Sequence, residues 1–380
     1  YPEDAPVVAP KPQNNATMKG VILAGSFGAR LVADISALHY SGVGSGRLGA
    51  TGSGGDARTM GAYVKELRGA VGDERIPEVL MDLDDIDVLE YWTLVLRQVE
   101  RLWPLEENLY VVCNEKDHTE FLEWADPEVS GTQFNQANIV SNGCLSKADW
   151  KGDAADLKLA IEHFGITCDV VAIGSASICY PDFNFSRVVE HSVIRNKDVL
   201  CVQAVGASHL ALNGDEVQTV VVPKDDHDVP MVVGFEERAA QAGDLIAQNM
   251  AVIKASSIPE VLASSAPSLT ALLQEFAAAR PIAAIKCGWG YFRLDTLRWL
   301  NYAHSFFIQF GIMKKSMAMK DKTQDTNSSI KFGTEDRTIT RMAEDVRAQM
   351  NSTIIQQFDE DYFGSGATNY QARMSYKIPS

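Results

Sequence analysis

The chain has 380 residues, 46% of them hydrophobic and 22% charged, which is typical of a globular protein with a sizeable core. Its formal net charge of −16 excludes a surface built to bind nucleic acid or an anionic membrane. No run approaches the ~20 apolar residues of a membrane span, and the 6 cysteines, without CxxC spacing, are typical of free thiols in a reducing compartment. We therefore expect an intracellular protein. Because the chain begins at Tyr1, prior removal of a mitochondrial or plastid targeting peptide stays open.

Residues 1–17 are rich in proline and polar side chains and are expected to form an extended arm. The first apolar run, Val21–Ala24, predicts a buried strand that ends in a turn punctuated by glycines. Such a turn exposes backbone N–H groups, and a cation just beyond it completes a cradle for an anion. The residues of this candidate phosphate loop are Leu23, Ala24, Gly25, Ser26, Gly28 and Arg30.

Residues 32–74 contain a glycine–serine tract with no core-forming pattern. Glycine density by itself indicates flexibility, so we interpret this segment as a Gly-rich surface insertion. A lid that cradles phosphate is the alternative interpretation.

Between residues 75 and 312, apolar runs alternate with amphipathic stretches. Strands are expected at 109–113, 138–140, 169–173, 199–204, 219–222, 229–235 and 250–254, and helices at 89–102, 120–124, 152–163, 268–279 and from 298. The alternation in the first half predicts a Rossmann-like α/β fold, with a mixed, mostly parallel sheet and helices on both faces. Ligands of such sheets bind beyond the carboxyl ends of the strands, where Gly25, Gly174 and Gly288 are expected to lie.

Residues 313–380 are expected to form an extended tail with one candidate helix at Glu335–Gln349. Outside that helix the tail has no periodic apolar face from which to build a core. It carries spaced aromatic side chains at Phe358, Tyr362, Phe363, Tyr370 and Tyr376. Because aromatic anchors in an extended segment are typical of binding to a partner, we expect the tail and the N-terminal arm to contact other protein subunits. Packing of the aromatics on the chain's own domain is the alternative.

The candidate phosphate loop resembles the L-A-G-G-x-G-x-R-L signature of the sugar-1-phosphate nucleotidyltransferase superfamily, which wraps a nucleoside triphosphate. Further landmarks of that family follow in order: the Pro-Lys segment at Ile76–Leu80, the G-x-A-x-x-L helix start at Gly152–Leu157, the strand-end Gly-Asp at Gly174–Ser175 and the late G-x-Y-F-D-x-G-T-L at Gly288–Leu297. The resemblance implies a nucleotide-diphospho-sugar transferase fold over residues 18–312, with a nucleotide base held near Gly152. No hexapeptide repeat follows residue 313, so the β-helix domain of active relatives is not expected.

The same motifs are degenerate at the positions that carry the chemistry. The two aspartates that hold Mg²⁺ in the family correspond to Ser175 and Arg293, and the lysine of the Pro-Lys segment corresponds to Glu78. A hydroxyl and a guanidinium are poor partners for Mg²⁺, and Glu78 reverses the charge that would face phosphate. Ser26 replaces a loop glycine, and the sugar-site Glu-Lys-Pro is represented only by an acidic stretch around Glu237.

The resemblance with these departures implies a catalytically inactive nucleotidyltransferase-like protein that acts as a structural or scaffolding subunit of a larger assembly. No cofactor, metal site or catalytic residue is expected, while the phosphate loop and Gly152 are expected to retain weak nucleotide binding. One alternative is an active enzyme that makes a nucleotide sugar and pyrophosphate, with Mg²⁺ held by Asp295, two residues beyond Arg293. The other alternative is a sensor that binds a sugar nucleotide without turning it over.

Overall fold

The structure is a computed structural model that describes residues 17–40, 75–81, 83, 86–128, 134–180, 183–206, 210, 212, 217–226, 229–287 and 291–324. Residues 1–16 of the expected N-terminal arm, the glycine–serine tract and the candidate helix at 335–349 lie outside the described residues. So do Gly288 and the aromatic residues of the tail.

A nine-stranded sheet forms the centre of the described part. Its strands are β1 (Met18–Ala24), β2 (Leu109–Cys113), β3 (Ile139–Ser141), β4 (Asp169–Gly174), β6 (Val199–Ala204), β7 (Val217–Asp226), β8 (Val229–Ala239), β9 (Leu245–Ile253) and β10 (Ile282–Lys286). Their spatial order is β3-β2-β1-β4-β9-β6-β10-β8-β7, and β7 also pairs with β9. The last five strands of this spatial order therefore close into a small barrel. A separate two-stranded sheet pairs β5 (Ser177–Cys179) with β11 (Tyr291–Arg293).

The sheet is parallel only in part, which corrects the expectation of a mostly parallel sheet. Strands β3, β2, β1 and β4 run parallel, and so do β6 and β10. Strand β9 is antiparallel to its three neighbours, and β8 is antiparallel to β7 and β10. The connections explain the difference. Residues 227–228 join β7 to β8 and residues 240–244 join β8 to β9, and such short connections permit only antiparallel pairing.

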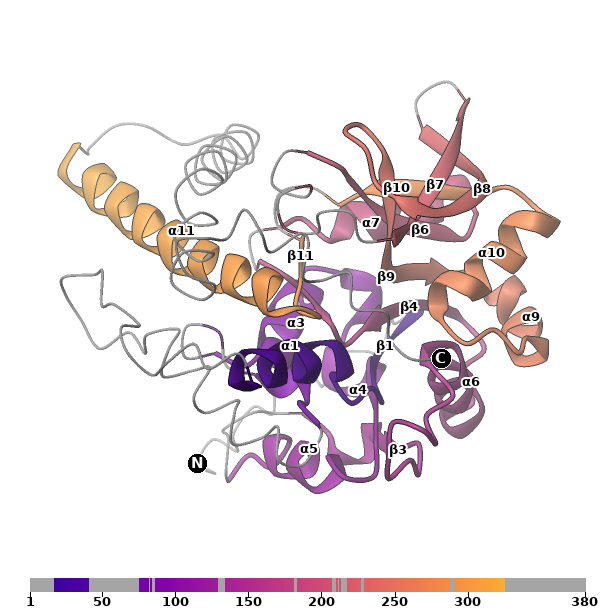
Figure 1. Cartoon of the computed structure of the whole chain (residues 1–380), viewed down its shortest axis with the longest axis horizontal. Coiled ribbons are helices and arrows are strands. Elements are labelled where there is room, and N and C mark those ends of the chain that lie inside the picture. Colours follow the sequence, from indigo (N-terminus) through magenta and orange to yellow (C-terminus); the bar gives the residue numbers. More distant parts are fainter. Residues whose placement is uncertain are drawn as a thin grey trace, which may run out of the picture.

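Helices cover both faces of the sheet, as predicted (Figure 1). They are α1 (Ala29–Tyr40), α3 (Val88–Leu96), α4 (Leu105–Asn108), α5 (His118–Trp124), α6 (Asp153–Phe164), α7 (Ser186–Arg195), α9 (Ile258–Ala263), α10 (Leu269–Ala279) and α11 (Leu297–Gln324). Alternation along β1 sorts its side chains between the two faces. Ile22 packs in the core that contains Trp92 of α3, and Leu23 packs in the core that contains Leu157 of α6.

The aromatic-rich helix predicted from residue 298 is α11, and its first half is part of the core. Its Trp299, Tyr302, Phe306, Phe307 and Phe310 are all at most 2% exposed. The helix continues to Gln324, which corrects the assignment of residues 313–324 to an irregular tail. Those residues are mostly lysine, methionine and alanine, which are strong helix formers, so the chain has no reason to leave the helix at residue 312.

The predicted insertion also begins later than expected. Helix α1 runs from Ala29 to Tyr40, so residues 32–40 are helical and do not belong to a flexible segment. The sequence carried a signal for this helix, because the apolar residues Leu31 and Ile35 are one helical turn apart. The structure buries both side chains.

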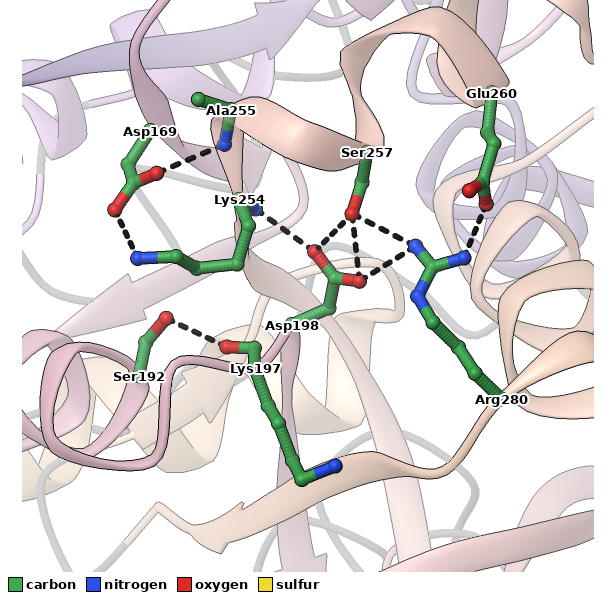
Figure 2. Close-up of polar contacts among 9 residues, drawn as sticks. All are labelled: Asp169, Ser192, Lys197, Asp198, Lys254, Ala255, Ser257, Glu260 and Arg280. Carbon is green, nitrogen blue, oxygen red and sulfur yellow. Dashed lines mark hydrogen bonds and ion pairs between the residues drawn. The ribbon is translucent and has the colours of Figure 1, made fainter.

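A polar network closes the edge of the sheet at which β4, β6 and β10 begin (Figure 2). Asp198, immediately before β6, is its centre. The Asp198 carboxylate accepts hydrogen bonds from the backbone N–H of Lys254 at 2.8 Å, from Ser257 Oγ at 2.8 and 2.9 Å, and from Arg280 Nη2 at 2.8 Å. Both of its oxygens are therefore partnered, and the side chain is only 2% exposed.

Two further ion pairs extend this network. Asp169, the first residue of β4, accepts from Lys254 Nζ and from the backbone N–H of Ala255 at 2.8 Å, and Arg280 also pairs with Glu260. The contacts join the starts of three strands to the end of β9 and the start of α9. Since its carboxylates are occupied by these partners, we interpret the network as structural.

Candidate functional site

The opposite edge of the sheet, where β1 and β4 end, carries the candidate phosphate loop. Strands β1 and β4 pair in parallel with Leu23 opposite Gly174, and the backbone N–H of Ser175 donates to the carbonyl of Leu23 at 3.1 Å. The structure therefore brings the loop after Ala24 next to the strand-end pair Gly174–Ser175, although about 150 residues separate them along the chain.

Three residues identified in the sequence as departures from the family pattern contact one another at this edge. Ser26 Oγ lies 2.8 Å from Glu78 Oε2, Ser175 Oγ lies 3.0 Å from the same oxygen, and the two hydroxyls are 2.9 Å apart. Glu78 begins a short 3-10 turn, η2 (Glu78–Leu80). Glu78 and Ser175 are each 4% exposed. The two hydroxyl hydrogens can serve only two of these three contacts while Glu78 is ionised, and all three become hydrogen bonds only when the carboxyl is protonated. We call this set of contacts the Ser–Glu–Ser triangle.

Burial raises the pKa of the Glu78 carboxyl to about 7. The hydroxyls of Ser26 and Ser175 oppose that rise, and the charges of Asp295 and Asp153 add to it. The carboxyl therefore changes its protonation state near neutral pH. The triangle therefore places two hydroxyls and a titrating carboxyl beside the loop that follows β1.

The backbone of the loop at Gly25 faces a buried carboxylate. A Cβ placed on Gly25 would fall far inside contact distance of the Asp156 carboxylate and the Asn142 amide. Asp156 is 3% exposed and accepts hydrogen bonds from Asn142 Nδ2 and from Trp150 Nε1, both at 2.9 Å. Burial raises the pKa of Asp156, and these two donors limit the rise. The glycine is required for close packing, and the group packed against it is an acid.

Gly152 is required by the backbone at the start of α6. Its φ is 99°, in the region that side chains avoid, and an added Cβ would collide with the carbonyl oxygen of Pro267. The next residue, Asp153, is 8% exposed, accepts a hydrogen bond from Asn249 Nδ2, and has a pKa raised by burial to about 7. Asp153 and Asp156 both lie in the first turn of α6, so carboxyl groups of this chain occupy the helix N-terminus, where an anion is favoured.

Asp295 is held by two guanidiniums. Arg30 Nη1, from the start of α1, donates to Asp295 Oδ2 at 2.8 Å, and Arg293 donates to both carboxylate oxygens, with Nε to Oδ1 at 3.0 Å. Burial disfavours the ionised form of Asp295, but the guanidiniums of Arg293 and Arg30 favour it and hold the pKa of Asp295 below the usual value. We call this set the Arg–Asp–Arg bridge.

The Mg²⁺ ion that the resemblance implied does not fit these residues. Ser175 contributes a hydroxyl that belongs to the triangle, Arg293 contributes a guanidinium, and Asp295 is already paired with two cations. Within the part of the chain that the structure describes, no group of three or more His, Cys, Asp or Glu side chains is arranged to hold a metal ion.

Glu237 is not brought to this edge. It lies on β8 and accepts a hydrogen bond from Thr219 Oγ1 of β7 at 2.6 Å. The acids that do lie at the site, Asp153 and Asp156, were missed as site residues. Their signal in the sequence was their position in the first helical turn after Gly152, which by itself is equally typical of ordinary helix starts.

No protein-family model matches this sequence, and no curated protein does. Solved structures do match. One described as a glucose-1-phosphate thymidylyltransferase from Bacillus anthracis, in complex with a sucrose, is 14% identical with a TM-score of 0.50, over 76% of this chain and 94% of that chain. A UDP-glucose pyrophosphorylase complexed with UDP-glucose is 10% identical with a TM-score of 0.50, over 77% of this chain and 99% of that chain.

These likenesses show the fold. The described part of the chain has the mixed α/β fold of the sugar-phosphate nucleotidyltransferases, as the sequence motifs predicted. Among its described helices, none has the length and apolar character needed to cross a membrane.

Proposed function

We propose that this chain is a catalytically inactive nucleotidyltransferase-like protein that serves as a structural subunit of a larger protein assembly. The observation that carries the proposal is that the ligand-binding edge of the sheet is filled by the chain's own polar contacts. The Ser–Glu–Ser triangle and the Arg–Asp–Arg bridge use the side chains that would have to bind metal and phosphate.

Nucleotidyl transfer depends on positioning and on neutralising the charge of phosphate by metal ions and cationic side chains. Removing one well-placed electrostatic group typically costs on the order of 10²–10³ in rate. Here Ser175 and Arg293 replace the metal ligands and Glu78 replaces the lysine, so the losses combine and leave negligible turnover.

The test is an assay of pyrophosphate release. The purified full-length chain is incubated with each common nucleoside triphosphate, a set of sugar-1-phosphates, and Mg²⁺ or Mn²⁺. We expect no release above that of a protein-free control. Robust release that disappears in the Asp295→Ala variant would overturn the proposal and make the chain an active nucleotidyltransferase. Sub-micromolar, Mg²⁺-dependent binding of a triphosphate without turnover would favour the sensor instead.

The structural role is proposed for the segment that follows α11. Its aromatic residues are the anchors through which we propose that it binds other subunits. A chain that ends after Gln324 keeps all of α11. We expect it to have the melting temperature of the full chain and to elute without the partners that accompany the full chain in size-exclusion chromatography. A large fall in melting temperature with the association intact would contradict this role and assign the tail to the chain's own core.

A further inference from the structure

The Ser–Glu–Ser triangle joins three segments that are far apart in the sequence. Ser26 lies in the loop that follows β1, Glu78 begins η2 52 residues later, and Ser175 follows β4 a further 97 residues along the chain. Both serine hydroxyls approach the same carboxyl oxygen, Glu78 Oε2, and they also approach each other. The three oxygens therefore form a ring that holds the loop against the end of β4.

The number of hydrogens in this ring depends on Glu78. With the carboxyl protonated, each of the three oxygens donates one hydrogen and accepts one, so the ring is complete. With the carboxyl ionised, two hydrogens remain for three contacts. If both hydroxyls then donate to Glu78, the oxygens of Ser26 and Ser175 face each other at 2.9 Å with no hydrogen between them. The ring is thus complete only in the protonated state.

The surroundings of Glu78 favour the same state. The side chain is buried, and the charged groups that act on it most strongly are two acids, Asp295 and Asp153. Helix α3, which packs on η2, contributes one charged residue, Glu90, and that residue is exposed. Arg30, just beyond the loop, pairs with Asp295. Ionisation therefore places a carboxylate in a buried site where the strongest neighbouring charges repel it.

We propose that the ring is a proton-operated latch, which fixes the loop after β1 when Glu78 is protonated and releases it when Glu78 ionises. The loop is the side that opens, because Ser26 is partly exposed whereas Glu78 and Ser175 are buried. Opening at Ser26 lets water reach the carboxylate. A pKa of about 7 for Glu78 places the change near neutral pH. The latch goes beyond the proposed function, since a structural subunit and an enzyme would both contain it.

Two backbone hydrogen bonds report whether the loop is closed. The N–H of Ile76 donates to the carbonyl of Phe27 at 3.2 Å, and the N–H of Val32 donates to the carbonyl of Gly28 at 2.9 Å. If opening exposes Glu78 to water, its pKa returns to 4.5 in the open form, so the equilibrium constant for opening rises with pH. The rise is about twentyfold from pH 5.5 to pH 7.5 and levels off above pH 7.

Hydrogen exchange of the full chain, followed by mass spectrometry, tests the latch, with each rate divided by that of an unstructured peptide at the same pH. In the wild type, we expect the protection of the peptides that contain Ile76 and Val32 to fall about twentyfold from pH 5.5 to pH 7.5. Glu78→Gln is expected to keep its protection at both pH values, because the amide nitrogen donates to both hydroxyls and does not titrate. Ser26→Ala detaches the loop from the ring. It is expected to show already at pH 5.5 the low protection that the wild type reaches at pH 7.5.

Glu115→Gln is the matched control. Glu115 Oε2 also accepts a hydrogen bond from a serine, Ser141 Oγ at 2.6 Å, but Glu115 is exposed. Its removal changes the net charge equally, and the exchange of this variant is expected to follow the wild type at each pH. The amides of α10 serve as an internal reference for unfolding of the whole chain, and at pH 7.5 the loop amides are expected to be less protected than these.

Three results would overturn the proposal. The first is loop protection in the wild type that does not change with pH. The second is an equal fall in the wild type and in Glu78→Gln, because the titrating group would then lie elsewhere. The third is loop protection equal to that of α10 at both pH values, because the loop would then open only when the whole chain unfolds.

Discussion

Replacing Glu78 by glutamine is expected to raise the free energy of unfolding by about 3 kcal/mol above pH 7 and to have no effect of this kind below pH 4.5. Glutamine preserves the shape of the side chain and the contacts to Ser26 and Ser175. The variant therefore isolates the charge of Glu78 from its packing.

The direction follows from the pKa of Glu78, which is about 7 in the folded chain against 4.5 for the exposed group. The folded state thus holds the proton more tightly than the unfolded state. Below pH 4.5 the carboxyl is protonated in both states and costs nothing. As the pH rises from 4.5 to 7, the unfolded state ionises first and the folded state loses stability by about 1.4 kcal/mol per pH unit. Glutamine does not titrate and avoids this loss.

Urea unfolding of both proteins from pH 4 to pH 8 measures the difference. Glu237→Gln is the matched control, because Glu237 is an exposed carboxyl on β8, and its curve is expected to run parallel to that of the wild type. If the difference in the free energy of unfolding between Glu78→Gln and the wild type stayed constant across this range, ionisation of Glu78 would not destabilise the folded state. That result would contradict a raised pKa for Glu78.

Replacing Asp198 by alanine is expected to lower the free energy of unfolding by about 3 kcal/mol. The carboxylate is the common acceptor for Ser257, Arg280 and the backbone N–H of Lys254 (Figure 2). Its loss removes the acceptor of the Lys254 N–H and of the Ser257 hydroxyl, and it leaves Arg280 with only Glu260 and the Ser257 oxygen at the junction of β6, β9 and β10. The Arg280 side chain is 33% exposed, so water partly solvates its charge. The expected loss of stability therefore lies at the lower end of the range for buried ion pairs.

Glu260→Ala provides the comparison for Asp198→Ala. Glu260 pairs with the same arginine but is 48% exposed, and exposed ion pairs contribute about 0–1 kcal/mol. Urea unfolding at neutral pH is the measurement for both variants. Equal losses in the two would contradict the structural role of Asp198, because burial would then make no difference to the contribution of the pair.

The sequence by itself determined those elements whose signals are local. The apolar runs at 109–113 and 199–204 are strands β2 and β6 with the predicted bounds. The helix predicted at 268–279 is α10, and the hydroxyl of its N-cap Ser268 accepts from the backbone N–H of Ala271. The ordered family motifs predicted the fold that the solved structures share. Such signals are readable because periodicity and capping depend on neighbours a few residues apart.

The tertiary structure decided which distant residues meet. Ser26, Glu78 and Ser175 were each recognised as departures, but nothing in their spacing predicted that the three side chains hydrogen-bond to one another. Asp295 was considered only as a metal ligand, and the structure pairs it with Arg30 and Arg293. A pattern of single residues does not encode contacts across the sheet, because these depend on strand order and on the direction in which each connection returns. The candidate site is therefore a property of the folded chain.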